Sequence, residues 1–212
     1  MDAPMKWFEE HKFVALIRSG SADDAEAMIK AAAAGGLRIF DISAQTPQAI
    51  RLIETYSKKD NYFVGAGSVL DGEMAQRAIN AGAKFLSNPY TDRDVINVAK
   101  NNNTFVIAGA TTPTEAFNAW QFGADLVKIY PAGLAGGPAY LKAIRGPLPF
   151  LKLIAGGDVT VENAPEYLKH CVAVSVGKSL FDKALIRSDK WSEITERAKQ
   201  FTQKLESLKV AK

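Results

Sequence analysis

The chain is poor in the residues that cross-link small proteins or bind metals. Its 212 residues include one cysteine, Cys171, and two histidines, His11 and His170. A single cysteine excludes an internal disulfide and fits a reducing compartment. Neither histidine belongs to a cluster with metal-ligand spacing, so a metal site is not expected. A thiol catalyst built from His170 and Cys171 is disfavoured too, because adjacent residues on a strand point to opposite faces.

Strong net charge and long apolar runs are also missing. The net charge is +3, with 26 basic residues interleaved among 23 acidic ones. No basic run alternates with aromatic residues, so neither nucleic acid nor membrane is expected as a partner. No apolar run reaches the roughly 18 residues of a membrane-spanning helix. The segment Met1–Pro4 does not begin a signal peptide, which favours a cytoplasmic protein.

The chain also lacks linkers and low-complexity segments, and instead repeats one pattern. An alanine-rich helix, a glycine and a short hydrophobic strand follow one another around Gly35, Gly82 and Gly123. Glycine just after a helix accepts positive φ and lets the chain turn at once into a strand. The spacing between copies fits two βα units each. With 47% apolar residues, the chain is expected to form one domain over residues 1–212.

Eight hydrophobic segments alternate with helical ones, which predicts an α/β fold of the closed (β/α)8, or TIM, barrel type. The expected strands are Phe13–Arg18, Arg38–Ile42, Tyr62–Ala66, Lys84–Ser87, Thr104–Ile107, Asp125–Ile129, Leu151–Ile154 and Val172–Val176. The expected helices are Asp23–Ala34, Thr46–Ser57, Asp71–Ala81, Thr91–Lys100, Thr112–Phe122, Pro138–Ile144 and Val161–Leu168, flanked by Pro4–His11 and Lys190–Leu208. The alternative, a doubly wound sheet with a dinucleotide fingerprint, is weak because Gly65-Ala66-Gly67 lacks the third glycine.

Lys128 interrupts an apolar strand, Asp125–Ile129, and is the first candidate for chemistry. Burying an unpaired ammonium is costly, so such a lysine is paired, reaches water or is held neutral. A neutral amine attacks carbonyls and forms an iminium. The alternative is a lysine near the strand end whose head reaches solvent. In a barrel, active sites lie at the carboxyl ends of the strands, which favours the catalytic interpretation.

A lysine nucleophile also needs a carboxylate that moves protons. Asp41 is the acidic residue at a strand end with polar neighbours, and alternation puts it on one face with Ile39 and Ser43. The same alternation pairs Lys128 with Leu126. Asp41 could instead cap a helix or form a salt bridge to Arg18 at the barrel mouth. Asp158 is a second acidic residue near the mouth, and it could equally cap the next helix.

Glycine-bearing turns end the last two strands, at Gly156-Gly157 and at Gly177-Lys178-Ser179. Barrels often bind phosphate at the loops after strands 7 and 8. Glycines let backbone N–H groups approach an anion, and the Ser179 hydroxyl and Lys178 ammonium could add to the binding. The alternative is that the glycines only make tight turns. We expect a phosphate site here.

At these residues the chain resembles the class I aldolases that act on 2-keto-3-deoxy-6-phosphogluconate, on its galactonate isomer or on 4-hydroxy-2-oxoglutarate. The resemblance runs from about Phe13 to Phe181. Its most specific motifs are Gly65-Ala66-Gly67-Ser68-Val69-Leu70 and Val127-Lys128-Ile129-Tyr130-Pro131. The galactonate branch looks nearest, through Thr114-Glu115-Ala116-Phe117 and Asp41-Ile42-Ser43-Ala44-Gln45-Thr46-Pro47.

The resemblance implies a barrel, usually assembled as a homotrimer, that needs no metal or organic cofactor. It implies that Lys128 forms a Schiff base with the keto acid and that Asp41 moves protons through water. The keto-acid end would be held by Arg18, Gln45 and Ser68, and the phosphate by Gly156, Gly157, Gly177 and Ser179. The expected reaction is reversible cleavage of a 2-keto-3-deoxy-6-phospho sugar acid to pyruvate and glyceraldehyde 3-phosphate.

Three departures from the family pattern concern the rate and the substrate. The family base is a glutamate where Asp41 stands, and the gluconate branch commonly has an arginine where Gln45 stands. In Asn88-Pro89 the proline comes one position later than in many members. One alternative function keeps the lysine and cleaves 4-hydroxy-2-oxoglutarate or decarboxylates oxaloacetate. Another is a non-catalytic barrel that only binds a phosphorylated ligand.

Overall fold

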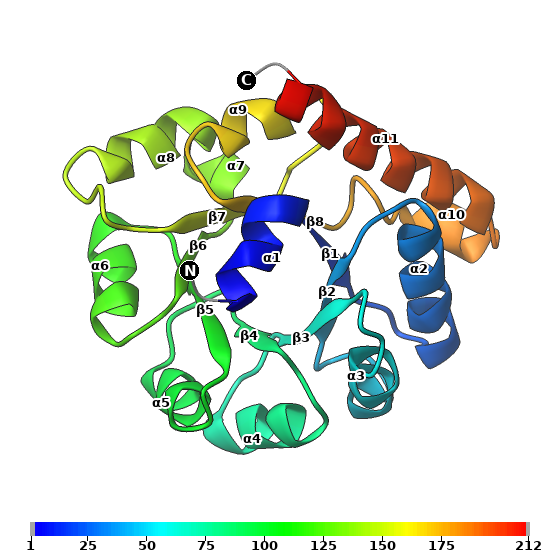
Figure 1. Ribbon diagram of the computed structural model, residues 1–212, viewed down its shortest axis with the longest axis horizontal. Coiled ribbons are helices and arrows are strands. Elements are labelled where there is room, and N and C mark those ends of the chain that lie inside the picture. The colour runs from blue at the N-terminus through cyan, green and yellow to red at the C-terminus, as the bar shows by residue number, and fades with distance from the viewer. Residues whose placement is uncertain (1–2, 211–212) are drawn as a thin grey trace.

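The computed structural model describes residues 3–210, and the side chains of residues 3–208. Met1 and Asp2 of the amino-terminal segment, and residues 211–212, lie outside the described residues. Eight parallel strands close into one barrel in sequence order, and the last strand pairs with the first (Figure 1). The (β/α)8 prediction is confirmed. Most helices lie between successive strands and surround the barrel (Figure 1).

The strands lie within two or three residues of their predicted positions. They are β1 Phe13–Ile17, β2 Ile39–Ser43, β3 Phe63–Gly67, β4 Phe85–Ser87, β5 Phe105–Ala110, β6 Leu126–Ile129, β7 Leu153–Gly156 and β8 Ala173–Val176. The largest corrections are at β5, which runs on to Ala110, and at β7, which begins and ends two residues later than predicted. Gly156 is therefore the last residue of a strand, where a loop was expected. The apolar runs located the strands, but ladder pairing with neighbours sets their ends.

The predicted helices are found, and most start later than expected. They are α1 Ala3–His11, α2 Ala22–Ala34, α3 Ala49–Ser57, α4 Gly72–Asn80, α5 Arg93–Asn101, α6 Pro113–Gln121, α8 Gly137–Arg145, α9 Ala164–Leu168 and α11 Trp191–Val210. Two short helices, α7 Ala132–Ala135 and α10 Lys183–Arg187, were not predicted. The predicted start of α3 is wrong because Gln48 adopts φ 56, which ends the turn before the helix.

Glycine ends the three repeated helix-to-strand turns as predicted. Gly36, Gly82 and Gly123 have φ values of 98, 92 and 103°. Only glycine adopts such angles without steric cost. Each turn is immediate, because the next backbone N–H bonds back into the helix: Leu37 to Ala32, Ala83 to Ala78 and Ala124 to Ala119. The helix and the following strand are thereby held close together.

Apolar side chains fill two regions, one between strands and helices and one inside the barrel. The inner region includes Ile39 of β2 and Leu126 of β6. Aromatic rings form its floor, where Phe8 of α1 stacks on Phe105 with centroids 5.2 Å apart and meets Phe63 and Phe85 edge-on. Helix α1 thus closes the amino-terminal end of the barrel, and Figure 1 shows it lying across the opening. In the part of the chain that the structure describes, the carboxyl-terminal end of the barrel is therefore left for a site.

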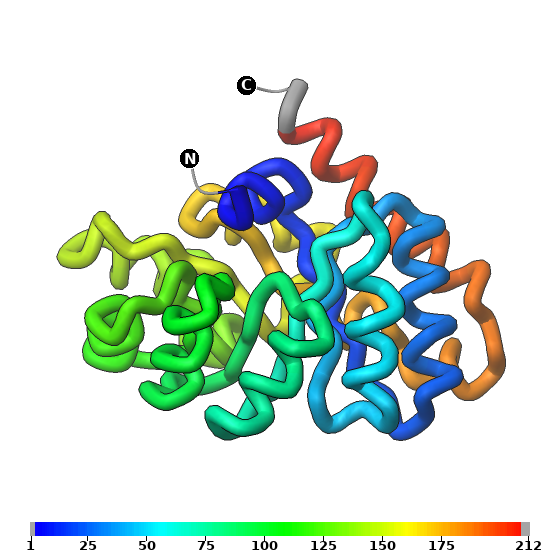
Figure 2. The backbone as a smooth tube through the Cα atoms, turned by 60° about the horizontal axis from the view of Figure 1, so that its bottom comes forward, coloured from blue at the N-terminus to red at the C-terminus, as the bar shows by residue number. Residues whose placement is uncertain are grey.

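The carboxyl-terminal helix α11 packs against α2. The hydroxyl of Thr195 donates to the carbonyl of Ala31, and that of Thr202 donates to the carbonyl of Gly35. Ala198 is fully buried between them. In Figure 2, α11 runs along the outside of the barrel next to α2 and rises at the end where α1 lies. The packing fixes the position of α11 relative to the loop after β8.

Candidate functional site

Lys128 points into the barrel. It alternates with Leu126 of the inner core on β6, so the predicted placement of these two residues on one face of the strand is confirmed. The residue is only 7% exposed. Its Nζ lies 3.7 Å from Oδ2 of Asp41 and 3.4 Å from Oγ of Ser87. The solvent-reaching alternative is therefore wrong, because the ammonium is buried and paired inside the barrel.

Asp41 is the buried partner of Lys128. It is 1% exposed and shares the inner face of β2 with Ile39, as the alternation predicted. Burial raises the pKa of its carboxyl above the usual range, and the nearby Lys128 ammonium opposes that shift. Oδ1 has no hydrogen-bond partner among the described residues. An oxygen in this state is available to accept a proton or a hydrogen bond from a bound molecule.

Two glycines leave the space that these charged groups occupy. A Cβ on Gly67 would collide with Oδ1 of Asp41. A Cβ on Gly156 would lie 2.9 Å from Cε of Lys128, closer than real Cβ contacts come. Backbone therefore packs directly against both chemical groups. Larger side chains at either position would displace the pair.

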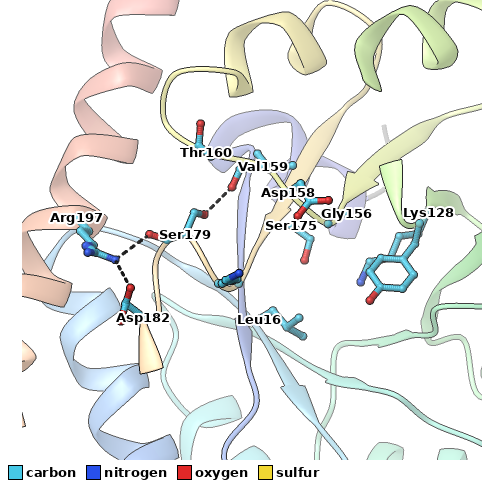
Figure 3. A pocket seen from close by; sticks show the side chains of 14 residues that line it. Leu16, Lys128, Gly156, Asp158, Val159, Thr160, Ser175, Ser179, Asp182 and Arg197 are labelled. Carbon is cyan, nitrogen blue, oxygen red and sulfur yellow. Dashed lines mark hydrogen bonds and ion pairs between the residues drawn. The ribbon is translucent and has the colours of Figure 1, made fainter. Parts of the chain in front are cut away.

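A cavity of about 550 Å³ extends from Lys128 to the loops after β7 and β8 (Figure 3). Four of the predicted phosphate-loop residues line it: Gly156, Gly157, Gly177 and Ser179. The hydroxyl of Ser179 donates to the carbonyl of Val159, which joins the two loops. The remaining lining residues are Leu16, Tyr130, Asp158, Val159, Thr160, Ser175, Lys178, Asp182 and Arg197.

The other predicted binding residues, Arg18, Gln45 and Ser68, follow the ends of β1, β2 and β3. Nη2 of Arg18 donates to Oγ of Ser68 over 2.7 Å, just beyond the ends of β1 and β3. Ser68 is buried with φ 54, whereas Gln45 is exposed in the loop after β2. These three residues and Asp41 are not among those that line the cavity. The alternative interpretation of Asp41 as a salt-bridge partner of Arg18 is not supported, because no such ion pair forms among the described residues, although the charge of Arg18 lowers the pKa of that carboxyl.

Several site residues were not found from the sequence. Ser87 and Ser175 follow Phe85 and Ala173 by two residues, and both of those belong to the inner core. Strand alternation could therefore have assigned the two serines to the inner face. Arg197 gave no such signal, because it lies on α11, far along the chain from every strand.

Cys171 takes no part in this site. Its thiol donates to the carbonyl of Tyr167 over 3.0 Å. Burial raises the pKa of the thiol to about 12, so the thiolate is scarce at neutral pH. Over residues 3–210, no three His, Cys, Asp or Glu side chains are grouped so that they could hold a metal ion. In the same range no helix is long and apolar enough to cross a membrane.

Comparisons with known proteins identify the family. The model of the KDPG and KHG aldolase family matches residues 5–197. The chain belongs to this aldolase family. A 2-dehydro-3-deoxy-phosphogluconate aldolase of Pseudomonas aeruginosa is 30% identical over 169 residues, which cover 79% of this chain and 77% of that protein. The family membership makes the chain a class I aldolase, and thus a lyase.

Relatives with different sugar acids in their names are equally similar. A 2-dehydro-3-deoxy-6-phosphogalactonate aldolase of Escherichia coli is also 30% identical, over 183 residues that cover 84% of this chain and 88% of that aldolase. The KDPG aldolase of Legionella pneumophila, solved with pyruvate captured as a covalent carbinolamine, is 27% identical with a TM-score of 0.81. The aligned region covers 93% of this aldolase and 97% of the Legionella chain. The resemblance predicted from the motifs is confirmed at the level of the family.

Proposed function

We propose that this aldolase reversibly cleaves a 2-keto-3-deoxy-6-phospho sugar acid, of the gluconate or galactonate type, to pyruvate and glyceraldehyde 3-phosphate. One observation carries the proposal. The buried amine of Lys128 lies at one end of a cavity whose other end is formed by the loops after β7 and β8. A substrate with a keto group and a phosphate at its two ends fits that arrangement. The covalent pyruvate adduct in the Legionella relative supports the same chemistry.

The reaction begins at the amine. The ammonium of Lys128 first loses a proton to water, and its neutral Nζ then attacks the C2 ketone and forms a carbinolamine, which loses water to give an iminium. A base removes the proton of the C4 hydroxyl, the C3–C4 bond breaks, and its electron pair moves into the iminium to form an enamine. Glyceraldehyde 3-phosphate leaves. Protonation of the enamine at C3 and hydrolysis of the iminium then release pyruvate and the free lysine.

Asp41 is the group that we assign to these proton transfers. Its Oδ2 lies 3.7 Å from the Nζ of Lys128, which is near the oxygen that must leave the carbinolamine as water. Its Oδ1 has no partner among the described residues, so it can hold a water molecule that reaches C3 or the C4 hydroxyl. The pKa of this carboxyl is raised and so lies closer to neutral pH than the pKa of an ordinary aspartate, which suits an acid–base group.

The two ends of the substrate are assigned to two groups of residues. The guanidinium of Arg18, fixed by Ser68, is the cation for the keto-acid carboxylate, and Gln45 adds a hydrogen bond. The glycine turns at 156–157 and at 177 offer backbone N–H groups to the phosphate. The hydroxyl of Ser179 is engaged with Val159. We therefore assign the contribution of Ser179 to its backbone and to the joining of the two loops.

Borohydride trapping with pyruvate tests the central step. The proposal requires a pyruvate-derived mass on the peptide that contains Lys128. Lys178 lines the same cavity and is exposed, so its peptide is an internal control that should stay unmodified. A Lys128→Met variant should lose both the adduct and the cleavage activity. Trapping on Lys178 instead, or on no lysine, would overturn the Schiff-base assignment.

Substrate assays separate the proposed reaction from its alternatives. We expect kcat/KM for the two phosphorylated sugar acids to exceed the values for 4-hydroxy-2-oxoglutarate cleavage and oxaloacetate decarboxylation. All four reactions pass through the same iminium, so a difference reports on the rest of the cavity. Equal rates for phosphorylated and unphosphorylated substrates would overturn the phosphate part of the proposal and leave the iminium part intact.

We also infer that the protein assembles as a homotrimer, which the family resemblance implies. An exposed apolar patch, formed by Phe117 and Trp120 of α6 and by Phe150, supports an interface, because the ring centroids of Trp120 and Phe150 lie 4.5 Å apart at the surface. Sedimentation velocity should give three chains per particle. A Trp120→Glu variant should lower that number, whereas Leu134→Glu, on α7, should not. A cytoplasmic location stays a prediction from the sequence.

A further inference from the structure

At the end of the cavity far from Lys128, one lining side chain is a cation that belongs to a helix outside the barrel. Arg197 lies on α11, yet it lines the same cavity as Lys128. Figure 3 shows it on the opposite side of the cavity from Lys128, next to Ser179 and Asp182. Helix α11 is held on α2 by its own packing. The backbone that carries the Arg197 guanidinium is therefore fixed next to the loop after β8.

The contacts of Arg197 leave much of its binding capacity unused. Its Nη1 donates to the carbonyl of Ser179 over 3.4 Å and lies 3.8 Å from Oδ2 of Asp182. Both distances are long for charge-assisted hydrogen bonds, which are usually about 2.7–2.9 Å. A guanidinium carries five N–H donors in a planar fork that matches phosphate. Within the described residues, both contacts use Nη1.

Other donors at this end also lack partners. The backbone N–H groups of Lys178 and Ser179 donate no hydrogen bond to any residue that the structure describes. Lys178 adds an exposed ammonium. Two carboxylates oppose an anion here, Asp158 and Asp182. Oδ1 of Asp182 caps α10 through the N–H of Ala184 over 2.7 Å, so Asp182 has a structural role besides its pairing with Arg197.

We propose that Arg197 binds the phosphate of the substrate, which makes the carboxyl-terminal helix part of the substrate site. The proposal rests on the phosphorylated substrate assigned above. In the ligand-bound protein the guanidinium turns from Asp182 to the phosphate, and the free N–H groups of residues 178 and 179 complete the site. Asp182 competes with the phosphate for Arg197, because a carboxylate and a phosphate match the same fork.

This competition gives opposite expectations for the two partners. If Arg197 binds phosphate, Arg197→Gln weakens binding and Asp182→Asn strengthens it, since Asn keeps the cap of α10 and removes the competing charge. If Arg197 only clamps the loop after β8, both changes loosen the same contact and both weaken binding. Arg187→Gln is the matched control, because Arg187 is exposed on α10 and is not among the residues that line the cavity.

Calorimetric titration with inorganic phosphate measures the site without any aldol chemistry. We expect the Kd to rise at least about tenfold in Arg197→Gln, the effect of losing one hydrogen bond to a charged group. It should rise less in Arg197→Lys, fall in Asp182→Asn and stay unchanged in Arg187→Gln. Equal Kd values for Arg197→Gln and Arg187→Gln, weaker binding in Asp182→Asn, or no phosphate binding by the unmutated protein would overturn the proposal.

Kinetics in the synthetic direction provide a second readout. With pyruvate and glyceraldehyde 3-phosphate, Arg197→Gln should raise KM for the aldehyde and leave kcat within about twofold, since the contact is remote from the bond that forms. With unphosphorylated glyceraldehyde the variant and the unmutated protein should be equal. Pyruvate trapping on Lys128 should persist in the variant, and its loss there would contradict a phosphate-specific role. Absence of trapping in the unmutated protein would defeat the aldolase mechanism and leave the phosphate titration interpretable.

Discussion

Nζ of Lys128 lies 3.7 Å from Oδ2 of Asp41, although β6 and β2 stand on opposite sides of the eight-stranded barrel. The two side chains meet because both project inward just above the apolar core. An ion pair in such a place is stabilised by attraction and destabilised by lost hydration, and removing one partner leaves the other charge uncompensated. A contribution of this pair to stability is therefore not expected to be large, which is consistent with the catalytic role proposed for it.

Changing Asp41 should slow the proton transfers of the reaction, whereas the adduct on Lys128 should still accumulate on long incubation with pyruvate. The carboxyl is 1% exposed and touches the backbone of Gly67, so the extra methylene of Asp41→Glu has to displace it from its position. We expect kcat to fall about tenfold in Asp41→Glu and about 10²–10⁴-fold in Asp41→Asn, the usual range for a lost acid–base group. Pyruvate trapping on Lys128 should persist in both. A gain of activity in Asp41→Glu would mean that the shorter side chain impairs the natural site.

The pH dependence of kcat should report the raised pKa of Asp41. The carboxyl must be ionised to accept a proton, so the rate falls as the pH drops through its pKa. Burial raises that pKa, and the acid limb should therefore be centred above about pH 4, the ordinary pKa of an aspartate. A kcat profile measured with saturating substrate tests this. An unchanged acid limb in Asp41→Asn would assign the limb to a different group.

Much of this site followed from elementary patterns in the sequence. Strand alternation put Asp41 with Ile39 and Lys128 with Leu126, and a barrel allows only one face to be interior. The glycine turns after β7 and β8 were found for a similar reason, since parallel strands in a barrel all end at one face. These features depend on local periodicity and on a fold that repeats, and both are visible in a single chain.

Contacts between elements that are distant in the sequence could not be predicted from it. Arg197 reaches the cavity because α11 packs on α2 at an angle that no local pattern encodes. The hydrogen bond from Arg18 to Ser68 depends on the left-handed backbone conformation of Ser68. A serine in a sequence does not indicate that conformation. The short helices α7 and α10 have four and five residues, too few for a helical period to show.

Gly67 should be essential for the position of Asp41. A methyl group at Gly67 would collide with Oδ1 of Asp41, and the surrounding barrel is too closely packed to yield. Gly67→Ala should lower kcat at least about tenfold, as expected for Asp41→Glu. Gly20→Ala is the control, since a Cβ there meets no atom within 4 Å. Equal activity of the two variants would show that the carboxylate relaxes without consequence.

Phe8 should hold the floor of the barrel. Its ring is fully buried and contacts the rings of Phe63, Phe85 and Phe105. Phe8→Ala removes this packing and opens a cavity, so the free energy of unfolding should fall by about 3–5 kcal/mol. Leu134→Ala, at a side chain that is 84% exposed, should change it by less than about 0.5 kcal/mol. Urea denaturation followed by circular dichroism compares the two, and a small effect at Phe8 would mean that α1 is not needed to close the barrel.

Cys171 should be chemically inert in the folded protein. Burial raises the pKa of its thiol to about 12, and the thiol is already engaged with the carbonyl of Tyr167. At pH 8 the thiolate fraction is then on the order of one in ten thousand, against about a quarter for an ordinary thiol. Iodoacetamide should therefore modify the protein far faster in urea than in buffer. Cys171→Ala should keep full aldolase activity, because no atom of Cys171 lines the cavity. Rapid labelling of the folded protein, with loss of activity, would contradict this prediction. It would mean that the thiol takes part in the reaction together with Lys128 and Asp41.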